Sequence, residues 1–241
     1  MVLNGGGSIN ATVIMEESSV NTINLYDGQD DTGTLLKSTN TPFTETFAIH
    51  SGYMYTKIGN IVNGDAVHFG GSVPQAEHMA NGSIKVSTDT TVYLIIERCL
   101  TGDTLITLAD NSVKRIDELT LNDKVLSYNE QGELVADKIL YTDANEHKIH
   151  TEYDIWTFDD GTILKTVHRH RFYNVEQKAM IYMNEWKLGE HARNLNGKDI
   201  ALINHETVKE EVSHYTLFTE HQNYFANGLL SGNRWTKKLN I

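Results

Sequence analysis

The 241-residue chain is poor in cysteine, proline and basic residues, and it has no long apolar run. Its single cysteine, Cys99, excludes an internal disulfide and any cysteine-rich metal site. With only two prolines and frequent Thr, Val, Ile and Tyr, the composition favours β-strands. No stretch reaches the roughly 18 apolar residues of a membrane span, so no membrane partner is expected.

Basic residues are too few for a nucleic-acid-binding surface. There are 20 Lys and Arg against 32 Asp and Glu, a net charge of −12, whereas a phosphate backbone needs a basic patch. The N-terminus lacks a basic stretch followed by an apolar one, so we expect no signal peptide and synthesis in the cytoplasm. The histidines lack zinc-ligand spacing, so no metal or other cofactor is predicted.

Residues 1–97 predict an all-β domain, either a β-sandwich or a small barrel. Segments 11–15, 21–26 and 91–96 are rich in β-formers, and turn residues such as Asp27-Gly28 separate the segments. Short strands at this spacing are typical of both architectures. His50, His68 and His78 are scattered and form no catalytic pattern, so this half is expected to have a structural role.

Residues 98–233 also predict a β-rich domain, followed by a short basic tail over 234–241. The pattern predicts strands at 105–108, 113–116, 124–128 and 155–158, with a hairpin turn at Asp159-Asp160-Gly161. A short helical turn is expected at 116–119 and a short helix within 185–195. Both halves together give an all-β fold class.

The single thiol and a distant asparagine suggest a chain that acts on its own backbone. Cleavage before Cys99 needs a nucleophile that attacks the carbonyl of Arg98, and cysteine is the most capable side chain for this attack. A histidine is the usual proton carrier near neutral pH. A second cleavage needs an asparagine, here Asn233, whose side-chain amide attacks its own carbonyl carbon.

Several segments resemble the Hint family of inteins, Hedgehog autoprocessing domains and bacterial intein-like domains. The segment CLTGDT at 99–104 is similar to the family's opening block, and DKVLSY at 123–128 continues the resemblance. The stretch from Gly161 to Tyr173 resembles the block that carries a threonine and a histidine, and YFANGLLSGN at 224–233 resembles the closing block. The resemblance implies a Hint-type β fold over 98–233 and autoprocessing activity.

The resemblance assigns roles to three residues around the first junction. Cys99 would be the nucleophile of an N-to-S acyl shift, and Thr166 and His170 would act on the scissile amide. The family places its threonine three residues before the histidine, whereas Thr166 lies four before His170. His168 therefore stays an alternative to His170, and a β-bulge would restore either geometry.

The closing block supplies the remaining candidates. Asn233 would be the cyclising asparagine, and His221, twelve residues earlier, would assist it. His214 occupies the region where many inteins carry Asp or Cys, and is either a base or a solvated strand residue. Asn227-Gly228 is a separate feature, a turn that shapes the last hairpin.

Two departures from the family pattern argue against splicing. Gly232 stands where the family has a histidine before its terminal asparagine, and Arg234 follows Asn233 where splicing needs Cys, Ser or Thr. Because arginine cannot accept an acyl group, we expect self-cleavage at Cys99, with cyclisation at Asn233, rather than joining of the flanks. The expected substrate is the chain itself.

The alternative interpretation is a structural protein. The acidic, Thr- and Gly-rich first half is similar to phage tail or virion modules, in which the Hint module would be slow, inactive or decorative. Other virion subunits or a homo-oligomer would then be the partners, and the virion the location.

Carbohydrate or receptor binding by the first half has only Tyr53 and Tyr55 in its favour. Adventitious metal at His168 and His170 would inhibit the chemistry.

Overall fold

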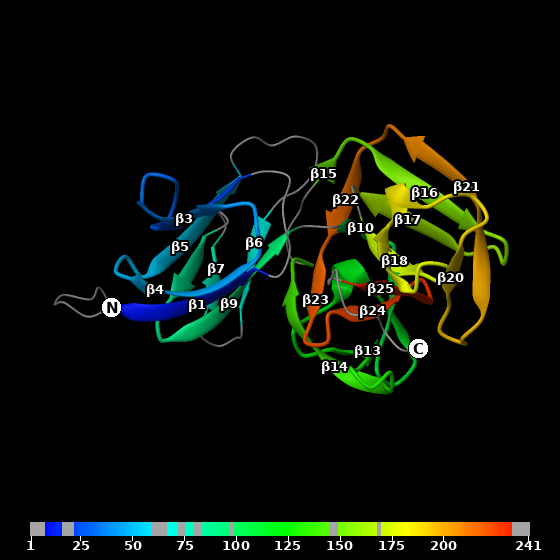
Figure 1. The fold of residues 1–241 in the computed structure, drawn as a ribbon, viewed down its shortest axis with the longest axis horizontal. Coiled ribbons are helices and arrows are strands. Elements are labelled where there is room, and N and C mark those ends of the chain that lie inside the picture. Colours follow the sequence, from blue (N-terminus) through cyan, green and yellow to red (C-terminus); the bar gives the residue numbers. More distant parts are fainter. Residues whose placement is uncertain are drawn as a thin grey trace. The chain divides into compact units, whose positions relative to one another are not determined.

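The computed structural model describes residues 8–15, 22–58, 67–71, 76–79, 83–96, 99–144, 149–167 and 170–232. At 67–71, 76–78, 95 and 96 it describes the backbone alone. The chain forms two compact units, 1–97 and 98–241, called the first and second units below (Figure 1). The described residues are all-β, with two single-turn 3-10 helices and no α-helix. No helix among them is long and apolar enough to span a membrane.

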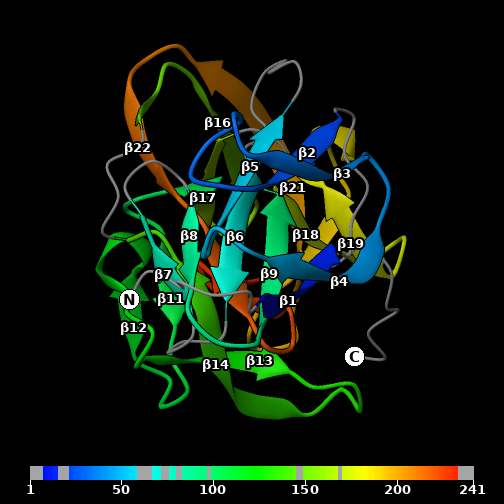
Figure 2. The ribbon, with the colours of Figure 1, turned by 90° about the vertical axis from the view of Figure 1, so that its left-hand side faces the viewer.

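The first unit consists of two sheets, with strand orders β4-β1-β9-β6 and β3-β2-β5-β8-β7 (Figure 2). Within the first sheet β1 is antiparallel to β4 and parallel to β9. The strands are β1 (Ile9–Met15), β2 (Ile23–Asp27), β3 (Thr34–Thr39), β4 (Phe43–Ile49), β5 (Tyr53–Ile58), β6 (Val67–Gly71), β7 (Ala76–His78), β8 (Ile84–Val86) and β9 (Thr90–Ile96).

One apolar core joins the two sheets of the first unit. Burial alternates along β1 and β2, as expected for strands with one face on a core. The core cluster takes side chains from both sheets, so the unit is a β-sandwich: Ala11, Val13, Met15, Ile23, Leu25, Ile49, Met54, Ile84, Val86, Val92 and Leu94. Each fully buried large side chain contributes about 1.5–3 kcal/mol.

Asp27 is a buried carboxylate at the end of β2. It accepts hydrogen bonds from the backbone amides of His50 (2.9 Å) and Ser51 (3.0 Å) and from the Ser51 hydroxyl. Burial alone would raise the pKa of the Asp27 carboxyl, but these hydrogen bonds together outweigh burial and hold the pKa below its ordinary value. The structure therefore favours the charged form of Asp27.

We expect the first unit to lose stability in acid because of Asp27. A carboxyl whose folded pKa is lowered contributes stability above its unfolded pKa, and this is lost as the pH falls through the folded pKa. All three tryptophans lie beyond residue 98, so circular dichroism changes without a fluorescence change report the first unit. Asp27→Asn should cost about 1–3 kcal/mol at pH 7 and flatten the decline below about pH 4. An unchanged pH profile would contradict this role.

The second unit is built around a sheet of thirteen strands. The order is β12-β11-β24-β25-β18-β20-β21-β16-β17-β10-β22-β15, with β19 paired to β18, and β13, β14 and β23 form a smaller sheet. The strands are β10 (Cys99–Thr101), β11 (Leu105–Thr107), β12 (Val113–Arg115), β13 (Lys124–Tyr128), β14 (Leu134–Thr142), β15 (Ile149–His150), β16 (Tyr153–Phe158), β17 (Ile163–Val167), β18 (Arg171–Asn174), β19 (Ala179–Tyr182), β20 (His191–Arg193), β21 (Asp199–Val208), β22 (Val212–Tyr215), β23 (Leu217–Thr219), β24 (Asn223–Ala226) and β25 (Leu229–Gly232).

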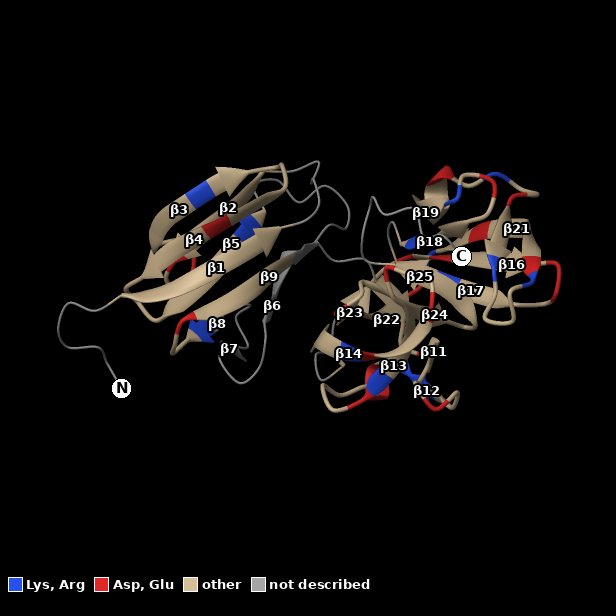
Figure 3. Ribbon diagram, turned by 60° about the horizontal axis from the view of Figure 1, so that its bottom comes forward, with Lys and Arg blue, Asp and Glu red and all other residues tan. Residues whose placement is uncertain are grey.

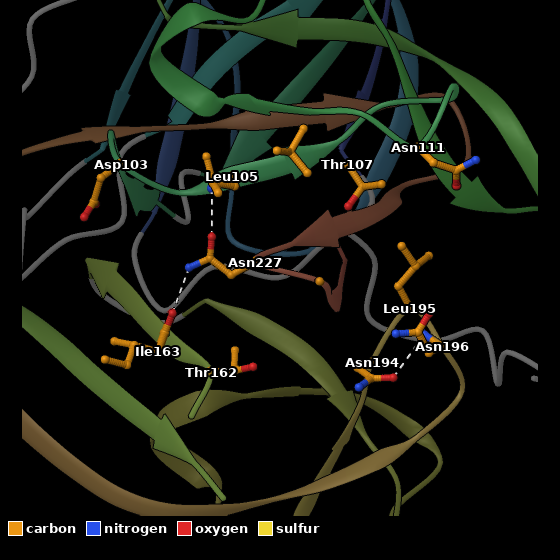
Figure 4. A pocket seen from close by; sticks show the side chains of 12 residues that line it. Asp103, Leu105, Thr107, Asn111, Thr162, Ile163, Asn194, Leu195, Asn196 and Asn227 are labelled. Atoms are coloured by element: carbon orange, nitrogen blue, oxygen red, sulfur yellow. Dashed lines mark hydrogen bonds between the residues drawn. The ribbon is translucent and has the colours of Figure 1, made fainter. Parts of the chain in front are cut away.

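The hairpin that joins β24 to β25 turns at Asn227-Gly228, as the sequence predicted. Both residues have positive φ, 48° and 77°, the conformation that Asn-Gly accommodates best in a two-residue turn. The Asn227 side chain accepts a hydrogen bond from the Leu105 amide and donates one to the Ile163 carbonyl, both 2.8 Å (Figure 4). These bonds tie the hairpin to β11 and β17.

The helix expected within 185–195 is absent, and that prediction was wrong. Met183–Glu185 forms a single 3-10 turn, and β20 then pairs with β21 through His191 and Ala201. Pairing with β21 gives the β20 backbone its hydrogen bonds, which overrides local helix propensity. The helical turn expected at 116–119 is confirmed as a 3-10 turn over Ile116–Glu118.

Candidate functional site

Cys99 begins β10, which lies between β17 and β22. Its neighbour across β17 is Val167, and Leu100 pairs with Tyr215 on β22. The thiol is completely buried, and its Sγ lies 3.4 Å from the hydroxyl of Thr216. Cys99, the nucleophile predicted from the sequence, is therefore enclosed by the protein and contacts a polar side chain.

Two residues at this site carried no signal in the sequence. Thr216 lies between β22 and β23, and its backbone amide donates a 2.7 Å hydrogen bond to the carboxylate of Asp143. Both side chains are buried. Asp143 follows β14, 44 positions after Cys99, so only the folded chain brings the three together. The carboxyl group of Asp143 therefore lies next to the residue that contacts the thiol.

His170 is buried just before β18 and contacts the last two strands. Its Nε2 lies 2.8 Å from the Ser231 hydroxyl on β25 and 3.3 Å from the Tyr224 hydroxyl on β24. The Ser231 hydroxyl donates to the Arg171 carbonyl at 3.2 Å, and the amide of Met183 donates to the His170 carbonyl at 2.9 Å. These bonds fix both the ring and the backbone of His170.

Tyr224 contacts His170 and interacts electrostatically with Cys99. Burial raises the pKa of the Tyr224 phenol far above its ordinary range, and the neighbouring charges of Cys99 and Asp143 raise it further, against the lowering effect of the Ser231 hydrogen bond. The phenol therefore stays protonated and can donate a hydrogen bond. We call Cys99, Asp143, Thr216, Tyr224, His170 and Ser231 the Cys99 cluster.

The Thr166 hydroxyl is directed to the apolar core. Thr166 pairs with Leu100, whereas Cys99 pairs with Val167. Because adjacent strand residues point to opposite faces, Thr166 lies on the other face from the thiol. Its buried hydroxyl accepts a 2.9 Å hydrogen bond from the Trp156 indole. The predicted Thr166 and Cys99 are thus neighbours in the sheet with different contacts.

Replacing Trp156 with alanine should destabilise the second unit by about 3–5 kcal/mol, because it empties a core position and leaves the Thr166 hydroxyl without its donor. Denaturant unfolding followed by the remaining tryptophans measures the loss. The matched control is Leu188→Ala, since Leu188 is 65% exposed and its truncation should cost no more than about 0.5 kcal/mol. A loss below about 1 kcal/mol for Trp156→Ala would argue against this core.

The other predicted histidines lie at separate places. His214 is buried on β22 opposite Thr101, with its ring centroid 6.2 Å from that of His150. His221, in the turn between β23 and β24, binds the Asp137 carboxylate through Nδ1 at 2.8 Å. Asp137 lies within β14 and Asp143 directly follows this strand, six residues or roughly 20 Å further on in an extended chain, so His221 is not at the Asp143 end of the strand.

Four residues named from the sequence lie outside the described residues: Arg98, His168, Asn233 and Arg234. The residue before Asn233 is described: Gly232 ends β25 and pairs with Asn223 on β24. One position earlier in β25, Ser231 contacts His170. The strand that leads to the second junction therefore contributes directly to the cluster around Cys99.

Outside the Cys99 cluster, the described polar groups of the second unit form ion pairs rather than a metal site. Within the described ranges, no three His, Cys, Asp or Glu side chains gather closely enough to share a metal ion. Basic residues pair with nearby acidic ones, as in Lys114–Asp123 and Arg193–Asp199. Basic and acidic positions are interspersed along the ribbon of the second unit (Figure 3). A pocket of about 540 Å³ beside Asn227 is lined by Leu105, Ile163 and Asn194, among others, and by no member of the Cys99 cluster (Figure 4).

Comparison with known proteins gives matches among solved structures. No protein-family profile matches the chain, and no curated protein is similar to it. A bacterial intein-like domain from Clostridium thermocellum is 20% identical over 57% of this chain and 99% of its own, with a TM-score of 0.51. A DnaB intein from Synechocystis sp. PCC 6803 is 19% identical over 57% and 99%, with a TM-score of 0.47.

The length of the match to the Clostridium thermocellum domain shows which unit of this chain resembles it. The first unit holds 97 of the 241 residues, too few to supply 57% of the chain, so the match requires the second unit. The all-β architecture expected for residues 98–233 agrees with this likeness, while the first unit is an additional β region. The second unit has the Hint fold of inteins and intein-like domains.

Proposed function

We propose that the second unit cleaves its own chain between Arg98 and Cys99. In this reaction the Cys99 sulfur attacks the carbonyl carbon of Arg98, a C–S bond forms and the C–N bond to Cys99 breaks. The thiol proton ends on the released amine of Cys99. Water or an external thiol then attacks the resulting thioester and frees residues 1–98. The observation that carries the proposal is the 3.4 Å contact between the Cys99 thiol and the hydroxyl of Thr216, whose amide is held by Asp143.

The Cys99 cluster supplies groups suited to each proton movement. Imidazole accepts and donates protons near neutral pH, so His170 protonates the leaving amine. The Tyr224 phenol, which stays protonated, donates to oxygen that becomes negative in the tetrahedral intermediate. Asp143 and Thr216 orient the thiol. Burial of the cluster excludes water from the acyl shift and strengthens these interactions.

A second cleavage follows at Asn233. Its side-chain amide attacks its own backbone carbonyl carbon, and the bond to Arg234 breaks, which releases residues 234–241 and leaves a succinimide. His221 assists this step. Because Arg234 offers no thiol or hydroxyl, the reaction ends in cleavage and the flanking segments are not joined.

Mass spectrometry of the purified chain tests the proposal. The chain is incubated with a small thiol between about pH 6 and pH 9, and we expect masses for 1–98 as the thiol's thioester and for 99–241. Loss of 234–241 reports the second step separately. An intact mass over days would overturn the proposal.

A second candidate function is structural, and the complete burial of Cys99 favours it. A thioester at an enclosed sulfur is poorly accessible to outside acceptors. In this alternative the first unit is a virion component that assembles with other virion subunits or with copies of itself, and the Hint unit reacts slowly or not at all. Sedimentation of an uncleaved chain as a defined oligomer would favour this role over autoprocessing.

A further inference from the structure

Asp137 is a completely buried carboxylate whose hydrogen bonds converge on His221. Asp137 Oδ1 lies 2.8 Å from His221 Nδ1 and accepts from the Lys138 amide at 2.9 Å. Its Oδ2 accepts from the His221 amide at 2.9 Å and from the Ser127 hydroxyl at 3.0 Å. The carboxylate therefore holds both the ring and the backbone of His221.

The pair lies at the end of the hairpin from which the chain continues to Asn233. Gly232 pairs with Asn223, and the Asn223 side chain donates a 2.9 Å hydrogen bond to the His221 carbonyl. His221 thus sits two residues from the partner of Gly232, at the open end of the β24–β25 hairpin. Its ring is about one-third exposed, and Nε2 has no hydrogen-bond partner within the described residues.

We propose that Asp137 is a positioning residue for cleavage after Asn233, an inference that rests on the proposed function. The ring nitrogen that carries the proton is set by the partner of the other nitrogen, and a carboxylate accepts only. Asp137 thus keeps the proton of neutral His221 on Nδ1 and leaves Nε2 with a free lone pair. Nε2 then takes the proton that the Asn233 amide loses on cyclisation and passes it to the departing amine of Arg234.

An asparagine at position 137 would lose one of the two backbone hydrogen bonds in either orientation of its carboxamide. Its carboxamide has one accepting oxygen and one donating nitrogen, whereas each oxygen of Asp137 faces a backbone N–H, from Lys138 on one side and from His221 on the other. With its nitrogen towards the ring, the carboxamide would donate to Nδ1 and favour the other tautomer of His221. A similar change in an aspartate–histidine pair is known to leave the geometry intact and still disable the base.

Asp137→Asn should slow the loss of 234–241 by about 10–100-fold and leave cleavage at Arg98–Cys99 within about twofold of wild type. His221→Ala should have a similar effect. The double variant should lose little more activity, because both substitutions remove the same proton acceptor, Nε2 of a correctly protonated His221. Ser127→Ala is the matched control: it removes a hydroxyl that hydrogen-bonds both Asp137 and the Asn223 carbonyl, leaves both bonds between Asp137 and His221 in place, and should keep most of the activity. Wild-type release of 234–241 by Asp137→Asn, or equal slowing at both junctions, would overturn the inference.

Nitrogen NMR of His221 in the full-length chain tests the same inference without any cleavage. The wild-type ring should carry its proton on Nδ1 when neutral, and Asp137→Asn should shift the proton to Nε2. If the wild-type ring carries its proton on Nε2, the inference fails even where the variant does not fold. If the tautomer is as expected and no 234–241 is released, then the proposed function has failed and the positioning role of Asp137 has not.

Discussion

Replacing Cys99 with alanine is expected to abolish cleavage at Arg98–Cys99, with a fall in rate of at least about 10³-fold. Nothing in the described part of the cluster replaces the thiol as a nucleophile, since the hydroxyls of Thr216 and Tyr224 are much weaker acids than a thiol at neutral pH. Cys99→Ser should retain a slow reaction through an ester. Electrophoresis and intact mass measure both rates.

The alanine variant must remain folded for this result to count. Cys99 is buried, but its side chain is small, so truncation leaves only a small cavity in the second unit. Unfolding of the second unit, followed by tryptophan fluorescence, should show a transition close to that of the wild type. Cleavage of Cys99→Ala at the wild-type rate and at the same bond would show that another group, or a contaminating protease, cuts the chain.

His170→Ala should slow the same cleavage by about 10²–10⁴-fold, the usual contribution of a positioned acid or base. His170 is buried with Nε2 on Ser231 and close to Tyr224, so its removal leaves the departing amine without a proton donor. Ser231→Ala should have a smaller effect, about tenfold, because Ser231 only orients the ring. Single-turnover rates over several pH values measure these effects.

The matched control for His170 is His168, the alternative left open by the sequence. His168→Ala should cleave at close to the wild-type rate, since His170 is the histidine that contacts the hairpin of the closing block. The reverse pattern, with His168→Ala inactive and His170→Ala active, would move the proton donor to position 168. The rates of these two variants therefore distinguish the two histidines.

Local patterns predicted the strands and turns well. Alternating or clustered β-formers located β9, β13 and β16, and Asn227-Gly228 located the last hairpin, because these signals depend on neighbouring residues. The helix predicted within 185–195 was wrong because this segment contains β20, which is stabilised by pairing with β21. A pattern confined to neighbouring residues does not reveal such a partner. Propensity is weak compared with such tertiary contacts.

The candidate site was predictable only where family blocks reach it. Cys99 and His170 lie in such blocks, and the Cys99 cluster includes both. Asp143 and Thr216 entered through folding alone, since both lie far from Cys99 in the sequence and outside the recognised blocks. For Thr166 the family block was recognisable in the sequence, but the direction of its side chain was not. The strand register directs its hydroxyl to Trp156.

The most direct test of the account is the mass of the first fragment after incubation with a small thiol. A thioester at Arg98 is the one product that an acyl shift makes and ordinary hydrolysis does not. The proposed acyl shift predicts residues 1–98 with one molecule of the thiol attached, converted to the free acid by hydroxide, and absent from Cys99→Ala. An intact chain, or a fragment 1–98 that appears only as the free acid and equally in Cys99→Ala, would contradict it.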